Sequence, residues 1–116
     1  MGDGANVKIV DGESTIYLYT HWDGSDLPKI VSKALSRRQR WDDGPYLARI
    51  IFEQMIEDDA KGETGYGISA NLGDGADRIV TVNVNKQEVS IHKTDWTFDN
   101  FTKIDDTVFL DIWYTT

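Results

Sequence analysis

The sequence has no cysteine, and its 116 residues include only two prolines and two histidines. Without cysteine there are no disulfides, thiolate metal ligands or cysteine nucleophiles, which agrees with a reducing compartment. No apolar run approaches the roughly 20 residues of a membrane-spanning helix, so we expect no membrane contact. His21 and His92 are not at metal-ligand spacing and no acidic calcium loop is present, so the sequence predicts no metal and no cofactor.

Charge and composition limit the classes of partner. Twenty acidic residues against twelve lysines and arginines give a net charge of -8. Such a chain is repelled by a phosphate backbone, which argues against direct binding to nucleic acid. The hydrophobic fraction of 40% is that of a folded protein,. The length suits a single domain over residues 1–116.

Alternating apolar and polar residues predict most of the strands. The first two alternating stretches flank Asp11-Gly12, a strong hairpin-turn signal,. Trp96–Thr102 does not alternate, and we expect a short helical turn there. The run TVFLDIWY is apolar on both faces of a strand except at Asp111, and it predicts a last strand. The expected strands are 6–10, 15–20, 66–72, 79–84, 88–92 and 107–114.

Two consecutive helices are expected in the first half of the chain. Apolar residues recur every three or four positions from Leu27 to Leu35, which is the stripe of an amphipathic helix,. Ser25 or Asp26 is expected to cap it. Asp43 is expected to cap a second helix from about Pro45 to Ala60, with a C-terminal end frayed by acidic residues. The order of elements predicts an α+β fold, a mostly antiparallel sheet with two consecutive helices packed on one face.

The segment His21-Trp22-Asp23 joins the second expected strand to the first helix. An imidazole and a carboxylate at such a place can form an acid/base pair, and a helix N-terminus favours an anion nearby. In the alternative interpretation Trp22 packs on the sheet and Asp23 stabilises an Asx-turn. The spacing does not decide between the two.

Basic residues form a stripe on the first helix. Lys29, Lys33 and Arg37 are four residues apart and share one face, which Arg40 extends,. The stripe can bind an anionic ligand or an acidic protein surface, or it is simply the solvated face of the helix. Arg49, close to the apolar side of the second helix, needs either a ligand anion or an internal carboxylate, for which the candidates are Asp23, Asp42, Asp43 and Glu53.

A glycine-spaced loop, Gly62 to Gly67, follows the second helix. It lacks the Lys-Ser/Thr of a P-loop and does not follow a strand as a dinucleotide fingerprint does. The glycines around Thr64 and Tyr66 allow close approach of the backbone to a ligand. A helix end followed by the entry to a strand explains the same residues.

Three blocks in this order, YLYTHWDGSDLP, RWDDGPYLARIIFEQM and GETGYGIS, lie within residues 15–70. Together they resemble a family of small proteins of bacteriophages and prophages. The resemblance implies a phage-encoded protein that acts in the host bacterial cytoplasm. It assigns no catalytic role to any residue.

The first functional hypothesis is a non-enzymatic binding protein that sequesters or blocks a host factor in antiviral defence. Its target is either a small anionic ligand, such as a nucleotide, or a host protein that meets an acidic or aromatic surface. One alternative is a small hydrolase that uses His21 and Asp23 as acid and base, and another is a virion or assembly component. A homodimer is also expected, from Trp113 and Tyr114 beside the expected last strand. The candidate ligand-binding residues are His21, Trp22, Asp23, Lys29, Lys33, Arg37, Arg40, Arg49, Thr64 and Tyr66.

Overall fold

A six-stranded sheet lies at the centre of the computed structural model, which describes residues 2–116. The strand order is β3-β2-β1-β4-β5-β6. Among residues 2–116 only the central β1–β4 pair is parallel, and the other four pairs are antiparallel. The strands are β1 (Ala5–Asp11), β2 (Ser14–Thr20), β3 (Tyr66–Ser69), β4 (Ile79–Asn83), β5 (Glu88–Ile91) and β6 (Thr94–Thr97).

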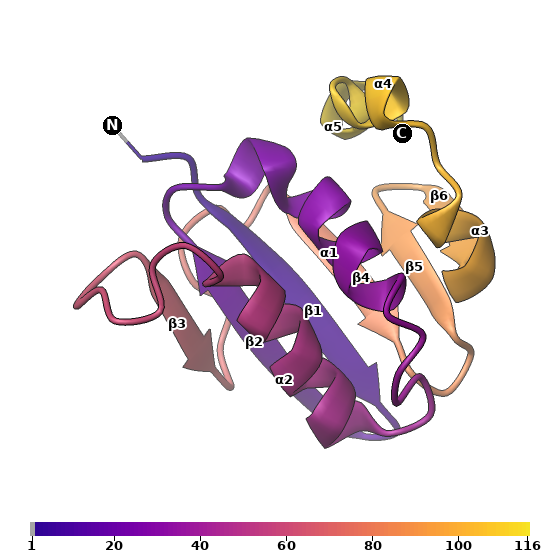
Figure 1. Cartoon of the computed structure of the whole chain (residues 1–116), viewed down its shortest axis with the longest axis horizontal. Helices are drawn as coiled ribbons and strands as arrows, with labels where there is room; N and C mark the ends of the chain where they lie inside the picture. The colour runs from indigo at the N-terminus through magenta and orange to yellow at the C-terminus, as the bar shows by residue number, and fades with distance from the viewer. Residues whose placement is uncertain (1) are drawn as a thin grey trace.

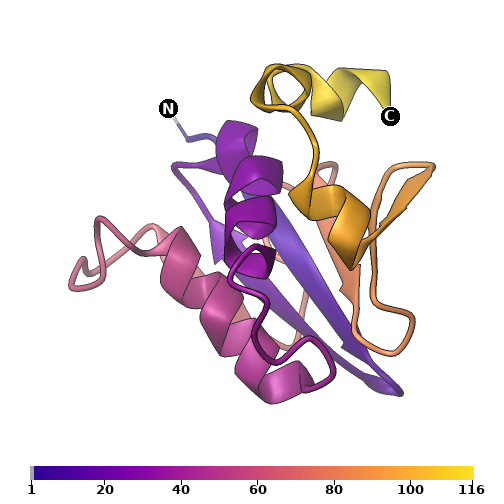
Figure 2. The same ribbon diagram turned by 45° about the vertical axis from the view of Figure 1, so that its right-hand side comes forward.

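Helices cover one face of this sheet (Figures 1 and 2). The two longest, α1 and α2, follow each other in the chain and pack together across the sheet. A short 3-10 turn, η1, leads into α1. The expected α+β class, with two consecutive helices on one face, is confirmed. The helical segments are η1 (Gly24–Asp26), α1 (Leu27–Leu35), α2 (Gly44–Met55), α3 (Phe98–Thr102), α4 (Asp106–Phe109) and α5 (Ile112–Thr115).

The core fills the space between the sheet and the helices. Alternate residues of β1, among them Val7 and Ile9, are buried against the apolar stripe of α1. Phe98 and Phe101 of α3 are fully buried and extend the core toward β6. The Phe101 ring lies edge-on to Phe109 at 5.8 Å between centroids, which ties α4 to the same core,.

The connection from β3 to β4 crosses the face of the sheet that the helices leave open. Both strands run parallel to β1, so the chain must return to the start of the sheet between them. Residues 70–78 make this return, and the side-chain amide of Asn6 donates to the backbone oxygen of Asp74 at 2.8 Å. This crossing places Asp74, Asp77 and Arg78 beside the N-terminal segment and the end of β2.

The prediction of a last strand at residues 107–114 is wrong. These residues form α4 and α5, because Phe109, Ile112 and Trp113 are buried at the spacing of a helix,. Asp105 caps α4 by accepting from the backbone N–H of Thr107 at 2.9 Å,. The strand edge on which the homodimer hypothesis rested is therefore replaced by helix.

Several boundaries also differ from the expectation. Helix α2 ends at Met55 instead of Ala60, because acidic residues follow where the helix dipole disfavours them,. Strand β3 ends at Ser69 instead of residue 72. Of the expected helical turn 96–102, the first two residues belong to β6 and the rest form α3. Asp43 caps α2 as expected, accepting from the backbone N–H of Tyr46 at 3.3 Å.

Asp26 occupies the N-cap position of α1, but its side chain makes no capping hydrogen bond to the described residues. The 3-10 turn η1 leads directly into the helix instead. Among residues 2–116, no helix has both the length and the apolar composition needed to span a bilayer.

Candidate functional site

Four of the expected site residues meet between α1, the end of α2 and the start of β3. Asp23, Lys29, Lys33 and Tyr66 line a cavity of about 350 Å³, here called the helix-end cavity. The Tyr66 hydroxyl donates to Asp23 Oδ2 at 2.5 Å. Acidic residues dominate the rest of the charged lining, which includes Asp26, Glu57 and Asp58.

The helix-end cavity is a poor place for an anion. Burial raises the pKa of Tyr66 above its usual range, and the hydrogen bond to Asp23 and the negative charges of Asp23, Asp59 and Asp58 raise it further,. The same field opposes a bound phosphate or carboxylate. Lys29 and Lys33, the cations expected to attract one, are each paired with a carboxylate.

The whole expected basic stripe is in fact neutralised by ion pairs. Arg49 pairs with Glu53, so its expected internal partner is confirmed, although its side chain is 58% exposed. Exposed pairs of this kind contribute little stability, but they remove most of the positive field, since four carboxylates face these five cations and Glu53 serves both Arg37 and Arg49,. The pairs and their nitrogen–oxygen distances are Lys29–Asp106 at 3.6 Å, Lys33–Glu57 at 3.6 Å, Arg37–Glu53 at 2.9 Å, Arg40–Asp43 at 3.9 Å and Arg49–Glu53 at 2.5 Å.

His21 and Asp23 have different partners. The turn between them is organised by Thr20, whose hydroxyl oxygen accepts from the backbone N–H groups of Trp22 at 3.3 Å and Asp23 at 3.0 Å. The His21 ring shares a hydrogen bond with the Tyr19 hydroxyl, and Asp23 accepts from Tyr66. The structure thus gives the expected acid/base pair no direct contact.

Trp22 and Thr64 lie on the surface near this turn. Trp22 is 49% exposed, and its indole lies against Gly65, whose φ of 99° lies in the region that favours glycine,. The glycine-spaced loop therefore packs against the Trp22 indole. The Thr64 side chain is exposed. His21 lies edge-on to Trp22 with ring centroids 4.5 Å apart and faces a different cavity.

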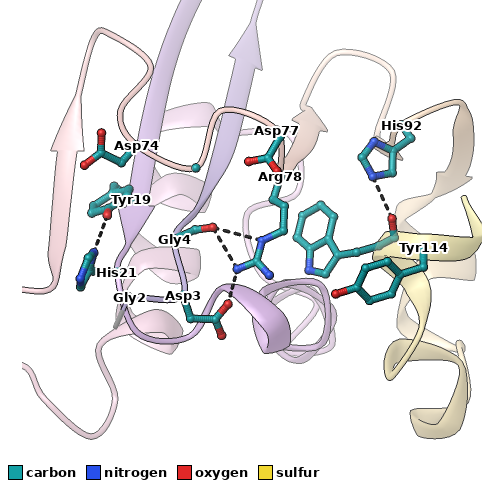
Figure 3. A pocket seen from close by; sticks show the side chains of 12 residues that line it. Gly2, Asp3, Gly4, Tyr19, His21, Asp74, Asp77, Arg78, His92 and Tyr114 are labelled. Atoms are coloured by element: carbon teal, nitrogen blue, oxygen red, sulfur yellow. Dashed lines mark hydrogen bonds and ion pairs between the residues drawn. The ribbon is translucent and has the colours of Figure 1, made fainter.

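That cavity, here called the terminal cavity, has a volume of about 630 Å³ and brings the two ends of the chain together (Figure 3). It contains both imidazoles of the chain, from the end of β2 and from the β5–β6 turn. Its residues are Gly2, Asp3, Gly4, Tyr19, His21, Asp74, Gly75, Asp77, Arg78, His92, Trp113 and Tyr114.

Arg78 organises one side of the terminal cavity. Its guanidinium group donates to the backbone oxygen of Gly4 from Nε at 3.1 Å and from Nη2 at 3.0 Å, and it pairs with the Asp3 carboxylate (Figure 3). The guanidinium carbon lies 5.7 Å from the centre of the Trp113 ring,. The side chain is only 19% exposed, so this pair is more than a surface contact.

Asp3 is held as a carboxylate by these contacts. Burial works to raise its pKa, but hydrogen bonds from Arg78 and from the backbone and side chain of Ser25, with the charge of Arg78, outweigh burial and keep the pKa below its ordinary value,. The backbone oxygen of Asp3 also accepts from the N–H of Gly24 at 2.8 Å. The N-terminal segment is thereby fastened to η1.

His92 and Trp113 form the other side. His92 has a φ of 52°, which is uncommon for a residue with a side chain,. Its Nε2 lies 3.1 Å from the Trp113 backbone oxygen, and the Trp113 indole N–H donates to the backbone oxygen of Gly24 at 3.0 Å. These two bonds anchor α5 over the cavity and place the 83% exposed ring of Tyr114 at its rim.

The lining of the terminal cavity combines a neutral phenol, charged groups and aromatic rings. Burial, followed by the charge of Asp74, raises the pKa of the Tyr19 phenol, which favours its neutral form,. Three carboxylates and one guanidinium group accompany the aromatic rings. Within residues 2–116, no cluster of three or more His, Asp and Glu side chains can hold a metal ion.

Sequence reasoning missed most of this cavity. His21 was a candidate, but Asp3, Arg78 and His92 carried no local signal because their partners lie far away in the chain. Trp113 and Tyr114 were noticed only as aromatics for an interface. One local signal was available: Tyr19 in β2 and His21 directly after the strand are two residues apart, the spacing that puts strand side chains on the same face,.

Comparison of the chain with protein-family models, curated proteins and solved structures gave no match.

Proposed function

We propose that the protein is a non-enzymatic, phage-encoded binding protein that captures a small ring-bearing molecule of the host in the terminal cavity. The observation that carries the proposal is the combination of flat rings, one oriented arginine and accepting carboxylates in one concave site,. The phage origin and the host target come from the resemblance of the three sequence blocks. Sequestration of a signalling molecule would then keep it from its host receptor.

The cavity offers a distinct group for each part of a nucleoside-like ligand. The rings of Trp113 and Tyr114 can contact a base. Asp74 and Asp77 can accept hydrogen bonds from hydroxyl or amino groups. Arg78 uses Nε and Nη2 for Gly4 and Asp3, and within residues 2–116 its Nη1 has no acceptor. Those two N–H groups are free to donate to one acceptor group of the ligand.

The charge of the lining limits how anionic the ligand can be. Asp3, Asp74 and Asp77 oppose the single charge of Arg78. This balance disfavours a polyphosphate by repulsion. The carboxylates outnumber the cations here as they do in the helix-end cavity, so an uncharged nucleoside fits better than any nucleotide,.

Asp23, the partner that the hydrolase alternative assigns to His21, is bonded to Tyr66 instead, which favours binding over hydrolysis by that pair. His21 is bonded to the Tyr19 hydroxyl at 2.8 Å, and His92 to the Trp113 carbonyl oxygen at 3.1 Å. A general base must reach the group that it deprotonates. The hydrolase alternative paired His21 with Asp23, and it predicts turnover that is abolished in His21→Ala.

A thermal-shift screen with nucleosides, cyclic nucleotides and nucleoside triphosphates tests the proposal. A ligand at about 100 times its Kd stabilises the fold by about 2.7 kcal/mol, which raises Tm by roughly 10 °C in a chain of this size. We expect such shifts for the uncharged nucleosides, and turnover of none of the three classes.

Tyr114→Ala provides the matched variant, because this ring lines the cavity and is too exposed to support the core. We expect it to weaken binding about tenfold. Leu110→Ala, at a 78% exposed residue outside the cavity, is the control and should bind as the wild type does. A flat screen, or equal weakening by both variants, would refute the terminal cavity and favour a protein partner.

A further inference from the structure

A mainly apolar cavity of about 450 Å³, here called the α2 groove, lies between α2 and the first half of β2. Its lining includes Ile9 and Leu18, whose side chains are buried in the core. Ile16 and Phe52 are half-buried beside them, and Ile68 of β3 adds an apolar wall that is 56% exposed. The size and the few polar groups are typical of a small-molecule site. None of these residues belongs to the terminal cavity.

Strand β2 extends beyond the end of β3 at this groove. It begins at Ser14, but β3 pairs only with residues 17–20 of β2. Within residues 2–116, no strand lies beside Ser14, Thr15 and Ile16 on the side of β3. All three residues are part of the groove lining. A strand edge without a neighbour presents backbone donors and acceptors with which a ligand can pair.

Thr15 is the residue whose backbone groups face this open edge. The N–H of Val84 donates to the backbone oxygen of Val10 at 2.9 Å, so Val10 and the other even-numbered residues of β1 bond to the β4 side,. The odd-numbered residues of β1 bond to β2, where their partners have even numbers. The N–H and C=O groups of Thr15 therefore point away from β1, to the side where β3 has ended.

The pairing rules of a sheet define the polar part of the ligand. In an antiparallel pair, one residue uses the N–H and the C=O on either side of its α-carbon to bond to both groups of its partner. A ligand that pairs with Thr15 in this way carries an N–H and a carbonyl joined through one carbon, as an N-acyl amino acid does. Its direction is opposite to that of β2. The acyl chain then extends toward Ile16 and Ile68, and the carbonyl lies toward Ser14.

Asp11 determines which charge is tolerated at the carbonyl end. It is paired with Ser14 across the two strands, and a Cβ on Gly44 at the start of α2 would overlap its carboxylate. Asp11 accepts a hydrogen bond from Asn85 at 3.2 Å but forms no ion pair within residues 2–116. A free carboxylate on the ligand would be repelled there. Because the N-terminus of α2 already favours the charge of Asp11, a cation is not required and a neutral amide fits best.

We infer that the α2 groove binds a neutral N-acyl amino acid amide, with the acyl chain among the apolar side chains and the N–H and carbonyl paired with Thr15. Only one residue of β2 presents its backbone groups at the open edge. The site therefore accepts one such unit, which favours a small acylated molecule over an extended protein segment. The inference does not depend on what the terminal cavity binds, since the two cavities share no residue.

Titration of the isotope-labelled full chain with N-octanoylglycinamide, followed by NMR, tests the inference. We expect shifts confined to residues 14–18, 44–52 and 68, with the amide proton of Thr15 moving downfield as it gains an acceptor. The matched probe N-octanoylsarcosinamide has a methyl group in place of the N–H, and N-acetylglycinamide lacks the long chain. Each should bind at least about tenfold more weakly, the first because a hydrogen bond is lost and the second because fewer CH2 groups are buried.

Ala48→Leu fills the groove from α2, because Ala48 is half-buried in its lining. Leucine favours a helix nearly as well as alanine, so we expect an unchanged or higher Tm and a loss of binding of at least about tenfold. Ala60→Leu adds the same bulk at an exposed residue outside the groove, and as the control it should bind like the wild type. Ile68→Ala removes the exposed apolar wall and should weaken binding about fivefold, which keeps the test valid if Ala48→Leu does not fold,.

Separate variants distinguish the two cavities. Tyr114→Ala should leave binding in the α2 groove unchanged, and Ala48→Leu should leave any nucleoside binding in the terminal cavity unchanged. The inference is overturned if N-octanoylglycinamide shifts no groove residue at millimolar concentration. It is equally overturned if N-octanoylsarcosinamide or octan-1-ol binds as well as N-octanoylglycinamide, or if Ala48→Leu and Ala60→Leu bind it alike.

Discussion

The Tyr66 hydroxyl donates a hydrogen bond to Asp23 Oδ2 at 2.5 Å, which joins the first residue of β3 to the turn after β2. The two residues are 43 positions apart in the chain. The bond keeps Asp23 at the rim of the helix-end cavity and away from His21. It also places a neutral phenol among the carboxylates that raise its pKa.

Tyr66→Phe should lower the free energy of unfolding by about 1 kcal/mol near pH 8, because it removes this bond and leaves Asp23 without its partner. Since folding raises the phenol pKa, the stabilisation is complete below the unfolded-state pKa of about 10 and is lost as pH rises above it. Urea unfolding between pH 8 and pH 11 measures both effects. The wild type should lose stability more steeply than Tyr66→Phe above pH 10, and parallel curves would contradict the prediction.

Asp3→Asn should make the protein less sensitive to acid. The pKa of Asp3 is lowered by folding, so its stabilisation is present above the ordinary carboxyl value of about 3.9 and disappears as pH falls through the folded-state pKa,. The variant should be less stable than the wild type at pH 7 and approach it near pH 2. Glu13→Gln, in the exposed β1–β2 turn, is the control. A difference in stability between Asp3→Asn and the wild type that stays constant at all pH values would refute the prediction.

Gly65→Ala should destabilise the protein by more than about 1 kcal/mol. The φ of 99° strains any side chain at this position, and the new Cβ would overlap the Trp22 indole. Gly67→Ala is the matched control in the same strand region, because its Cβ enters open space at an ordinary φ. Chemical unfolding of both variants, with indole fluorescence as a report on Trp22, checks the prediction. Equal stabilities of Gly65→Ala and Gly67→Ala would show that packing of Trp22 does not require glycine at position 65.

His92→Gly and His92→Ala should separate backbone strain from the bond to Trp113. Glycine relieves a left-handed backbone cost of about 1–2 kcal/mol but loses a hydrogen bond worth about 0.5–1.5 kcal/mol, so its stability should stay near that of the wild type. Alanine keeps the strain and loses the bond, so it should be less stable by about 1 kcal/mol.

Amide hydrogen exchange provides the local measurement for the two His92 variants. Both should lose protection in α5, because both free the Trp113 carbonyl oxygen,. Unchanged protection in both would mean that the core contacts of Ile112 and Trp113 hold α5 without His92.

The candidate site was only partly visible in the sequence. His21 stands out at a strand end, and Tyr66 between two glycines. The pattern did not reveal that basic residues of the first helix region would be paired with Glu53 of α2 and with Glu57 just after it. Nor did it place Arg78 against Asp3, since the two residues are 75 positions apart. Side-chain pairing over such separations depends on the strand order, which local patterns do not encode.

The sequence by itself determined the elements whose causes are local: the Asp11-Gly12 hairpin, the apolar stripe from Leu27 to Leu35 and the Asp43 cap. In each case a few neighbouring residues satisfy their own hydrogen bonds or share one face. Only the tertiary structure decided the secondary structure of residues 107–114. Their apolar run fits a strand or a helix equally well. The helical form buries Phe109, Ile112 and Trp113 against the core together, and that burial against distant residues also built the terminal cavity,.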